Sequence, residues 1–188
     1  MNTRRTIPIV PVEAFGEKTL GGDLPQAIKK PTVGASGLSA MPPLTLYIHV
    51  PWCVRKCPYC DFNSHRAPEV IPEEAYLDAL AADLEQGLPL IWGRQIHAVF
   101  VGGGTPSLLS SEAIDRLLAM IRAYLPIWPD AEITLEANPG AAEAQRFKGY
   151  AQSGINRISL GIQSFNDTHL TALGRVHNSD QARAAIEM

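Results

Sequence analysis

The sequence predicts an α/β fold in which parallel strands alternate with helices. From residue 44 onwards, short β-prone runs and longer helical stretches follow one another, which is the pattern of βα units around a parallel sheet. The chain has 188 residues, of which 46% are hydrophobic and 19% charged, and this composition is enough to bury a sizeable core. About four βα units fit this length, so we expect about half of a TIM-like (β/α) barrel.

Four stretches favour strands. Residues 44–50 alternate apolar and polar side chains and stop at Pro51, as expected for a strand. The other predicted strands are residues 96–101, 131–137 and 157–162.

Three helices are predicted between these strands. Residues 72–86 begin with Pro72 in the first turn and acidic side chains beside it, and Gly87 follows as the expected end. Residues 110–124 place apolar side chains on one face after a serine N-cap. A shorter helix is expected over residues 141–152, and helical segments follow to the end of the chain.

The two ends of the chain differ from this middle part. Residues 1–42 contain repeated prolines and glycines without a sustained apolar period, so we expect a poorly ordered extension. Residues 43–188 would then form the amino-terminal part of a core domain. The last residues, 184–188, lie inside an apparent helix without a cap, and we therefore expect a fragment of a longer protein.

Charge and hydropathy exclude several classes of function. The net charge is -3 and both signs are interspersed, which argues against a nucleic-acid-binding surface. No stretch of about twenty apolar residues is present to form a transmembrane segment. The apolar run at residues 7–11 is short and broken by prolines, unlike a signal peptide. We expect a cytoplasmic protein.

Every chemically unusual cluster follows a predicted strand. In parallel α/β folds the carboxyl ends of the strands lie on one side, where binding sites form, so these clusters should converge. They are the cysteines at 53, 57 and 60 after the first strand, residues 102–106 (GGGTP) after the second, Glu136 and Asn138 at the end of the third, and Gln163 at the end of the fourth.

Cys53, Cys57 and Cys60 are the only cysteines and form a C-x3-C-x2-C motif. Three thiolates on one loop can hold three corners of a cubane [4Fe–4S] cluster and leave the fourth iron open for a small molecule. The alternative is a zinc site completed by His49 or His65. Structural zinc usually requires a second, distant ligand pair, and the sequence contains no second cysteine pair.

The glycine run and Glu136 suggest the rest of the site. Residues 102–105 would let the backbone approach a ligand closely and offer N–H groups to a carboxylate or carbonyl, although a purely structural glycine turn is the alternative. A carboxylate on a buried strand must be paired. Glu136 could bind a ribose hydroxyl or an ammonium, or it could satisfy a core arginine such as Arg157.

Residues 47–62 (YIHVPWCVRKCPYCDF) resemble the radical S-adenosylmethionine (SAM) enzymes. More narrowly, they resemble the group that contains oxygen-independent coproporphyrinogen III oxidase and the heme chaperone HemW. Residues 102–106, 136–139 (EANP) and 158–165 (ISLGIQSF) extend the match. The resemblance implies a partial barrel of the radical SAM type. It also implies a cluster that passes an electron to SAM, which yields methionine and a 5′-deoxyadenosyl radical.

The resemblance also implies roles for individual residues. Cys53, Cys57 and Cys60 would be the cluster ligands. Tyr59 would lie by the SAM adenine, and Tyr47 would contact SAM beside the cluster. The remaining contacts would be Gly103, Gly104 and Thr105 around the methionine part of SAM, with Glu136, Gln163 and Arg175 completing its binding.

One departure separates the two branches. The oxidases resemble C-x3-C-x2-C-x-C, whereas Phe62 occupies the fourth cysteine position here and Trp52 precedes the first cysteine. Both features resemble the heme chaperone branch, which implies heme as cargo, an electron donor for the cluster and recipient hemoproteins. The alternatives are the oxidase itself, acting on a porphyrin precursor, and a zinc-stabilised interaction module. Any heme-binding residues are expected downstream of residue 188.

Overall fold

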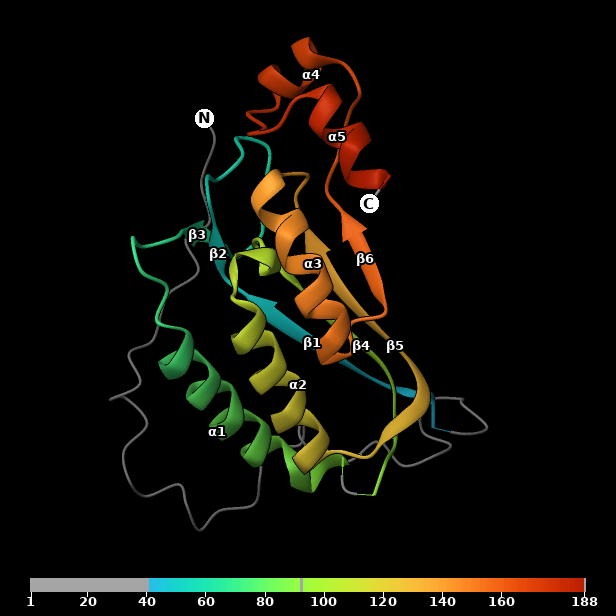
Figure 1. Ribbon diagram of the computed structural model, residues 1–188. Helices are drawn as coiled ribbons and strands as arrows, with labels where there is room; N and C mark the ends of the chain where they lie inside the picture. The colour runs from blue at the N-terminus through green and yellow to red at the C-terminus, as the bar shows by residue number, and fades with distance from the viewer. Residues whose placement is uncertain (1–40, 92, 188) are drawn as a thin grey trace, which may run out of the picture. The chain divides into compact units, whose positions relative to one another are not determined.

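A parallel four-stranded sheet forms the centre of the computed structural model, which describes residues 41–91 and 93–187 (Figure 1). Its strand order is β1-β4-β5-β6, and every neighbouring pair is parallel. The strands are β1 (Leu44–Val50), β4 (Ile96–Gly103), β5 (Ile127–Ala137) and β6 (Arg157–Leu160). Two short strands, β2 (Trp52–Cys53) and β3 (His65–Arg66), form a separate parallel pair. The predicted α/β fold with a parallel sheet is confirmed.

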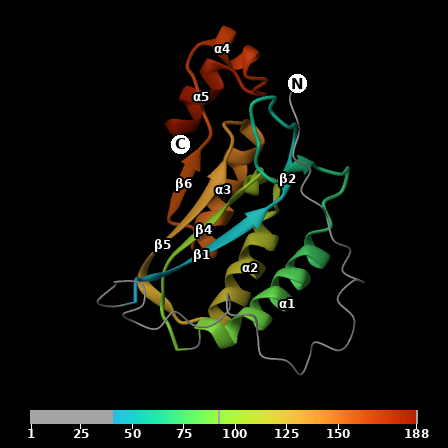
Figure 2. The same cartoon turned by 180° about the vertical axis from the view of Figure 1, so that it is seen from behind.

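Three helices cover one face of this sheet. They are α1 (Glu73–Ile91), α2 (Ser111–Tyr124) and α3 (Ala141–Ser153). The two opposite views place all three helices on the same side of the strands (Figures 1 and 2). The predicted apolar face of α2 is buried, with Ile114, Leu117, Leu118 and Ile121 at most 1% exposed. Burying each such side chain contributes about 1.5–3 kcal/mol, so this face holds α2 against the sheet.

The carboxyl ends of the strands carry the remaining elements. The 3-10 helix η4 (Pro106–Leu108) follows β4, while α4 (Asp167–Ala172) and α5 (Ser179–Ile186) follow β6. In Figure 1, α4 and α5 lie beyond the arrowhead of β6. The site described below lies at these carboxyl ends of the strands.

Four elements have boundaries that differ by two residues or more from the sequence predictions, and one of them, β4, continues to Gly103. Helix α1 was expected to end before Gly87 but continues to Ile91, because Leu84, Leu88 and Ile91 pack against the core along one face. Such packing outweighs the helix penalty of about 1 kcal/mol for glycine. Strand β5 begins at Ile127, which pairs with Ile96, and β6 ends at Leu160.

The predicted extension over residues 1–42 lies almost entirely outside the described residues. Within the described part of the chain, no helix is both long and apolar enough to cross a membrane.

Candidate functional site

The cysteine loop leaves β1 at Pro51 and returns through β3. The N–H of His65 donates to the carbonyl of Pro51 at 2.7 Å, and that of Ala67 donates to the carbonyl of Cys53 at 2.8 Å. Inside the loop, Lys56 Nζ donates to the carbonyls of Phe62 (2.7 Å) and Ser64 (3.0 Å). These bonds close the loop on itself and fix the backbone on both sides of the cysteines.

His49 anchors the far end of this loop to β1. Its Nε2 lies 2.7 Å from the carbonyl of Asn63, and its Nδ1 lies 2.9 Å from the Tyr47 hydroxyl. Because a carbonyl only accepts, Nε2 is the donor to Asn63, and this assigns Nδ1 as the acceptor from the Tyr47 hydroxyl. Both ring nitrogens are therefore used within the protein, which leaves His49 unsuited to complete a zinc site.

Tyr47 is the one predicted site residue that does not line the cavity described below. Its ring stacks on Phe100 at a centroid distance of 6.1 Å, and its hydroxyl is turned to His49. Burial raises the pKa of this hydroxyl above its ordinary value, and the charge of Glu136 raises it further. The prediction that Tyr47 contacts SAM stays a prediction.

The glycine turn at the end of β4 is hydrogen-bonded to the start of the cysteine loop. The N–H of Gly104 donates to the carbonyl of Val50 and that of Thr105 to the carbonyl of Trp52, both at 2.7 Å. A Cβ at Gly104 would lie 2.5 Å from the Trp52 oxygen and 3.0 Å from Cys53 Sγ. Glycine is therefore required for this close approach. We had expected these N–H groups to face a ligand, but those of Gly104 and Thr105 donate to backbone carbonyls within the protein.

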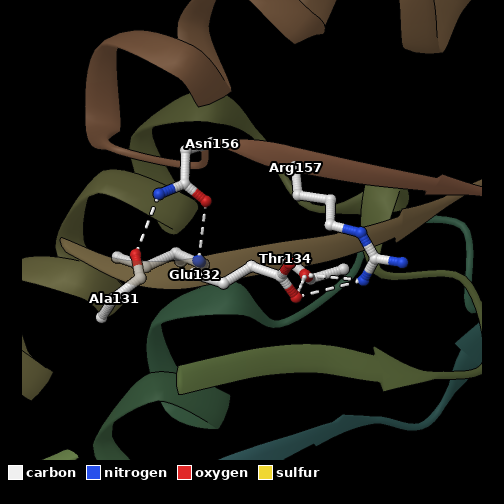
Figure 3. A network of polar contacts seen from close by, with 6 residues as sticks. Ala131, Glu132, Thr134, Asn156 and Arg157 are labelled. Carbon is white, nitrogen blue, oxygen red and sulfur yellow. Dashed lines mark hydrogen bonds and ion pairs between the residues drawn. The ribbon is translucent and has the colours of Figure 1, made fainter. Parts of the chain in front are cut away.

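Glu136 meets the same turn. Its Oε2 accepts from the N–H of Gly103 at 3.0 Å. Arg157, considered above as its partner, instead lies 3.2 Å from both Glu132 Oε1 and Thr134 Oγ1 (Figure 3). The carboxylate of Glu136 thus lies at the carboxyl end of β5, held by one backbone N–H.

Arg175, from the connection between α4 and α5, contacts the carboxyl ends of β5 and β6 and the cysteine loop. Its Nη2 donates to Asn138 Oδ1 at 2.5 Å and to the carbonyl of Gly161 at 2.6 Å, and its Nη1 lies 3.5 Å from Cys57 Sγ. Asn138 in turn donates from Nδ2 to Thr105 Oγ1 at 3.3 Å. Asn138 was expected among the residues that converge at the strand ends, but the sequence did not show its side-chain partners.

Gln163 occupies a tight turn after β6. Its φ of 72° is the only positive φ of a non-glycine residue in the described part of the chain, and the N–H of Ser164 donates across it to the carbonyl of Ile162 at 2.9 Å. Such a backbone conformation is strained and persists only when surrounding contacts hold it.

His177 provides one such contact, because its Nε2 lies 3.0 Å from the Ile162 carbonyl. The side chain is only 5% exposed. Burial lowers its pKa below the ordinary value, and the nearby charge of Arg175 lowers it further, while the bond to Ile162 opposes both. No pattern in the sequence pointed to this histidine.

These elements enclose a cavity of about 430 Å³, a volume typical of small-molecule sites. Every predicted site residue except Tyr47 lines it. They are Cys53, Cys57, Tyr59, Cys60, Gly103, Gly104, Thr105, Glu136, Gln163 and Arg175. The structure therefore brings together the four strand-end segments that were expected to converge, and Arg175 adds a fifth segment.

Comparison with known proteins identifies this arrangement. The sequence model of the Radical SAM superfamily matches residues 47–188. The chain belongs to the radical SAM superfamily. It is 55% identical over 152 residues to the heme chaperone HemW of Haemophilus influenzae and 51% identical over 148 residues to HemW of Escherichia coli. These alignments cover 79% of this chain but only 40% and 39% of the two relatives, so the chain spans about two fifths of their length.

A solved radical SAM structure also matches. It is coproporphyrinogen III oxidase (HemN) from Escherichia coli, with a TM-score of 0.70 and 32% sequence identity, covering 77% of this chain and 33% of that one. This likeness confirms the predicted radical SAM type of partial barrel.

The superfamily implies SAM and a [4Fe–4S] cluster, and the donor set can be tested against that cluster. Zinc needs ligands that converge on one point, with Zn–S distances of about 2.3 Å. In the part of the chain whose side chains the structure describes, no three His, Cys, Asp or Glu side chains converge in this way. In a cubane cluster each thiolate binds a different iron, so the sulfurs surround a space instead. Cys53, Cys57 and Cys60 line one cavity, which fits the cluster.

Proposed function

We propose that this chain is the cluster- and SAM-binding part of a heme chaperone of the HemW type, which binds heme and delivers it to hemoproteins. The observation that carries the proposal is Phe62. This side chain lies in the cavity wall and is 57% exposed, at the position where the oxidases would carry a fourth cysteine. A phenyl ring offers no donor to a metal, so the loop keeps three ligands.

The residues of the cavity divide the work of binding. Cys53, Cys57 and Cys60 would hold three irons, and the cluster when bound would supply an electron to SAM. Tyr59 would lie against the adenine, an aromatic contact available from a half-exposed ring in the cavity wall. Glu136, Gln163 and Arg175 would complete the binding of SAM, and Gly104 keeps the backbone close to Cys53.

Two partners follow from this proposal. The cluster needs an electron donor, and the heme needs a recipient hemoprotein. Heme itself would bind mainly through parts of the protein that follow this chain, consistent with the much greater length of the HemW relatives.

The test uses the full-length protein after anaerobic reconstitution of the cluster. The proposal predicts that a heme titration saturates and that coproporphyrinogen is not converted. Conversion to protoporphyrinogen over multiple turnovers would instead assign the oxidase function, which the structural match to HemN also allows.

Metal analysis of the same sample distinguishes the cluster-binding protein from a zinc-stabilised interaction module. About four irons with matching sulfide per chain supports the cluster. Stoichiometric zinc without iron would contradict it.

A further inference from the structure

Asn138 contributes its whole carboxamide to the wall of the cavity. Its Oδ1 accepts from Arg175 Nη2 at 2.5 Å, and its Nδ2 donates to Thr105 Oγ1 at 3.3 Å. The orientation of the amide follows from chemistry, because a guanidinium only donates and must face the oxygen. The amide nitrogen is therefore the group that faces Thr105.

This orientation sets the polarity of Thr105. The side chain is 4% exposed and lines the cavity, and its backbone N–H is already bonded to Trp52. Since Oγ1 accepts from Asn138, the hydroxyl proton remains to be donated, and it has no acceptor among the described residues. A buried hydroxyl without an acceptor costs free energy unless a ligand supplies one.

Arg175 strengthens the same preference. Its guanidinium forms no ion pair with any carboxylate in the described part of the chain, and its buried Nε has no hydrogen-bond partner there. Asn138 thus holds a hydroxyl donor and a guanidinium that pairs with no carboxylate among the described residues. A ligand carboxylate complements both groups.

We propose that Asn138 is a positioning residue that fixes Thr105 as a hydrogen-bond donor and orients the Arg175 guanidinium toward the carboxylate of bound SAM. The inference rests on the proposed function, since SAM is taken as the ligand. Asn138 itself acts through its two neighbours. Asn156 offers a matched control because both of its amide groups bind backbone atoms of β5, Ile133 N and Ala131 O.

The decisive variant is Asn138→Asp, which keeps the shape but changes the polarity. The new carboxylate would accept the Thr105 proton and pair with Arg175, and both would be lost to the ligand. The affinity of the reconstituted full-length protein is measured for SAM and for decarboxylated SAM, which lacks the carboxylate. We expect SAM to bind about 10- to 100-fold more weakly, the loss of a hydrogen bond to a charged group, and decarboxylated SAM to bind unchanged.

Four further variants guard against a merely structural effect. Thr105→Val should reproduce the selective loss of SAM affinity. The double variant Thr105→Val with Asn138→Ala should lose less affinity than the sum of the losses in Thr105→Val and Asn138→Ala measured singly. Asn156→Ala should leave both affinities unchanged. Iron and sulfide contents show whether each variant still holds the cluster.

The inference would be overturned if Asn138→Asp lost affinity for SAM and for decarboxylated SAM equally. It would also be overturned if Thr105→Val kept the wild-type difference in affinity between the two ligands. Neither result would contradict the proposed function. If cluster-loaded wild-type protein fails to bind SAM at all, the proposed function fails and the inference falls with it.

Discussion

Asn138 and Asn156 stand at opposite ends of neighbouring strands and use the same side chain differently. Asn156, before β6, accepts from the N–H of Ile133 at 2.8 Å and donates to the carbonyl of Ala131 at 2.9 Å (Figure 3). Asn138, after β5, binds the side chains of Arg175 and Thr105. At the amino end the amide joins backbone to backbone. At the carboxyl end it orders side chains around a cavity.

The arginines repeat this difference. Arg157 pairs with Glu132 at 3.2 Å, and both side chains are about half exposed, so the pair contributes little to stability. Arg175 faces an amide, a carbonyl and a thiol but no carboxylate in the described part of the chain. One end of the sheet satisfies its charges, and the other keeps a charge available for a ligand.

The largest expected effect is at the carboxyl end. Cys57→Ala removes one of three ligands, so the reconstituted protein should lose almost all bound iron and sulfide. The helical content in circular dichroism should stay unchanged, because the amino-end bonds do not depend on Cys57. Iron and sulfide at wild-type levels in this variant would contradict the role of Cys57 as a cluster ligand.

Next come two glycines with opposite surroundings. Gly104→Ala places a Cβ 2.5 Å from the Trp52 oxygen, so we expect destabilisation of about 1–3 kcal/mol. Gly87→Ala, with nothing within 4 Å in the middle of α1, should stabilise by about 0.5–1 kcal/mol. Urea unfolding measures both. Equal effects of the two substitutions would contradict the close approach at Gly104.

A smaller effect is expected at the amino end. Asn156→Ala leaves two backbone groups of β5 without their side-chain partner, which should lower the free energy of unfolding by about 1 kcal/mol. Urea unfolding detects this change. If the variant instead lost cluster iron while keeping its stability, the division between the two ends would be wrong.

The smallest effect concerns pH. Because the pKa of His177 is lowered in the folded chain, the unfolded chain binds a proton first as the pH falls through about 6.5. Stability should therefore decrease with falling pH until the folded pKa is reached, and stay level below it. Urea midpoints at about pH 7.5 and about pH 5.5 should differ more for the wild type than for His177→Gln. An equal pH dependence in both would contradict the buried neutral imidazole.

The sequence was sufficient for the fold class and for most of the residues that line the cavity. Alternating periods of apolar residues are local, and the parallel strands they predict bring every strand end to one side. Cys53, Gly103, Glu136 and Gln163 could be placed together for that reason alone. The boundary at Gly87 could not be predicted, because packing of Leu88 and Ile91 against the core decides it.

The sequence by itself determined which functional groups the site contains: three cysteines, a glycine turn and a strand-end carboxylate, in that order along the chain. Only the tertiary structure decided which partner each of these groups has. In the folded chain the N–H groups of Gly104 and Thr105 donate to backbone carbonyls, and the N–H of Gly103 donates to Glu136. Arg175 donates to Asn138, which lies 37 residues away in the sequence. Hydrogen bonds depend on distances of a few ångströms between residues far apart in sequence, and strand periodicity does not fix those distances.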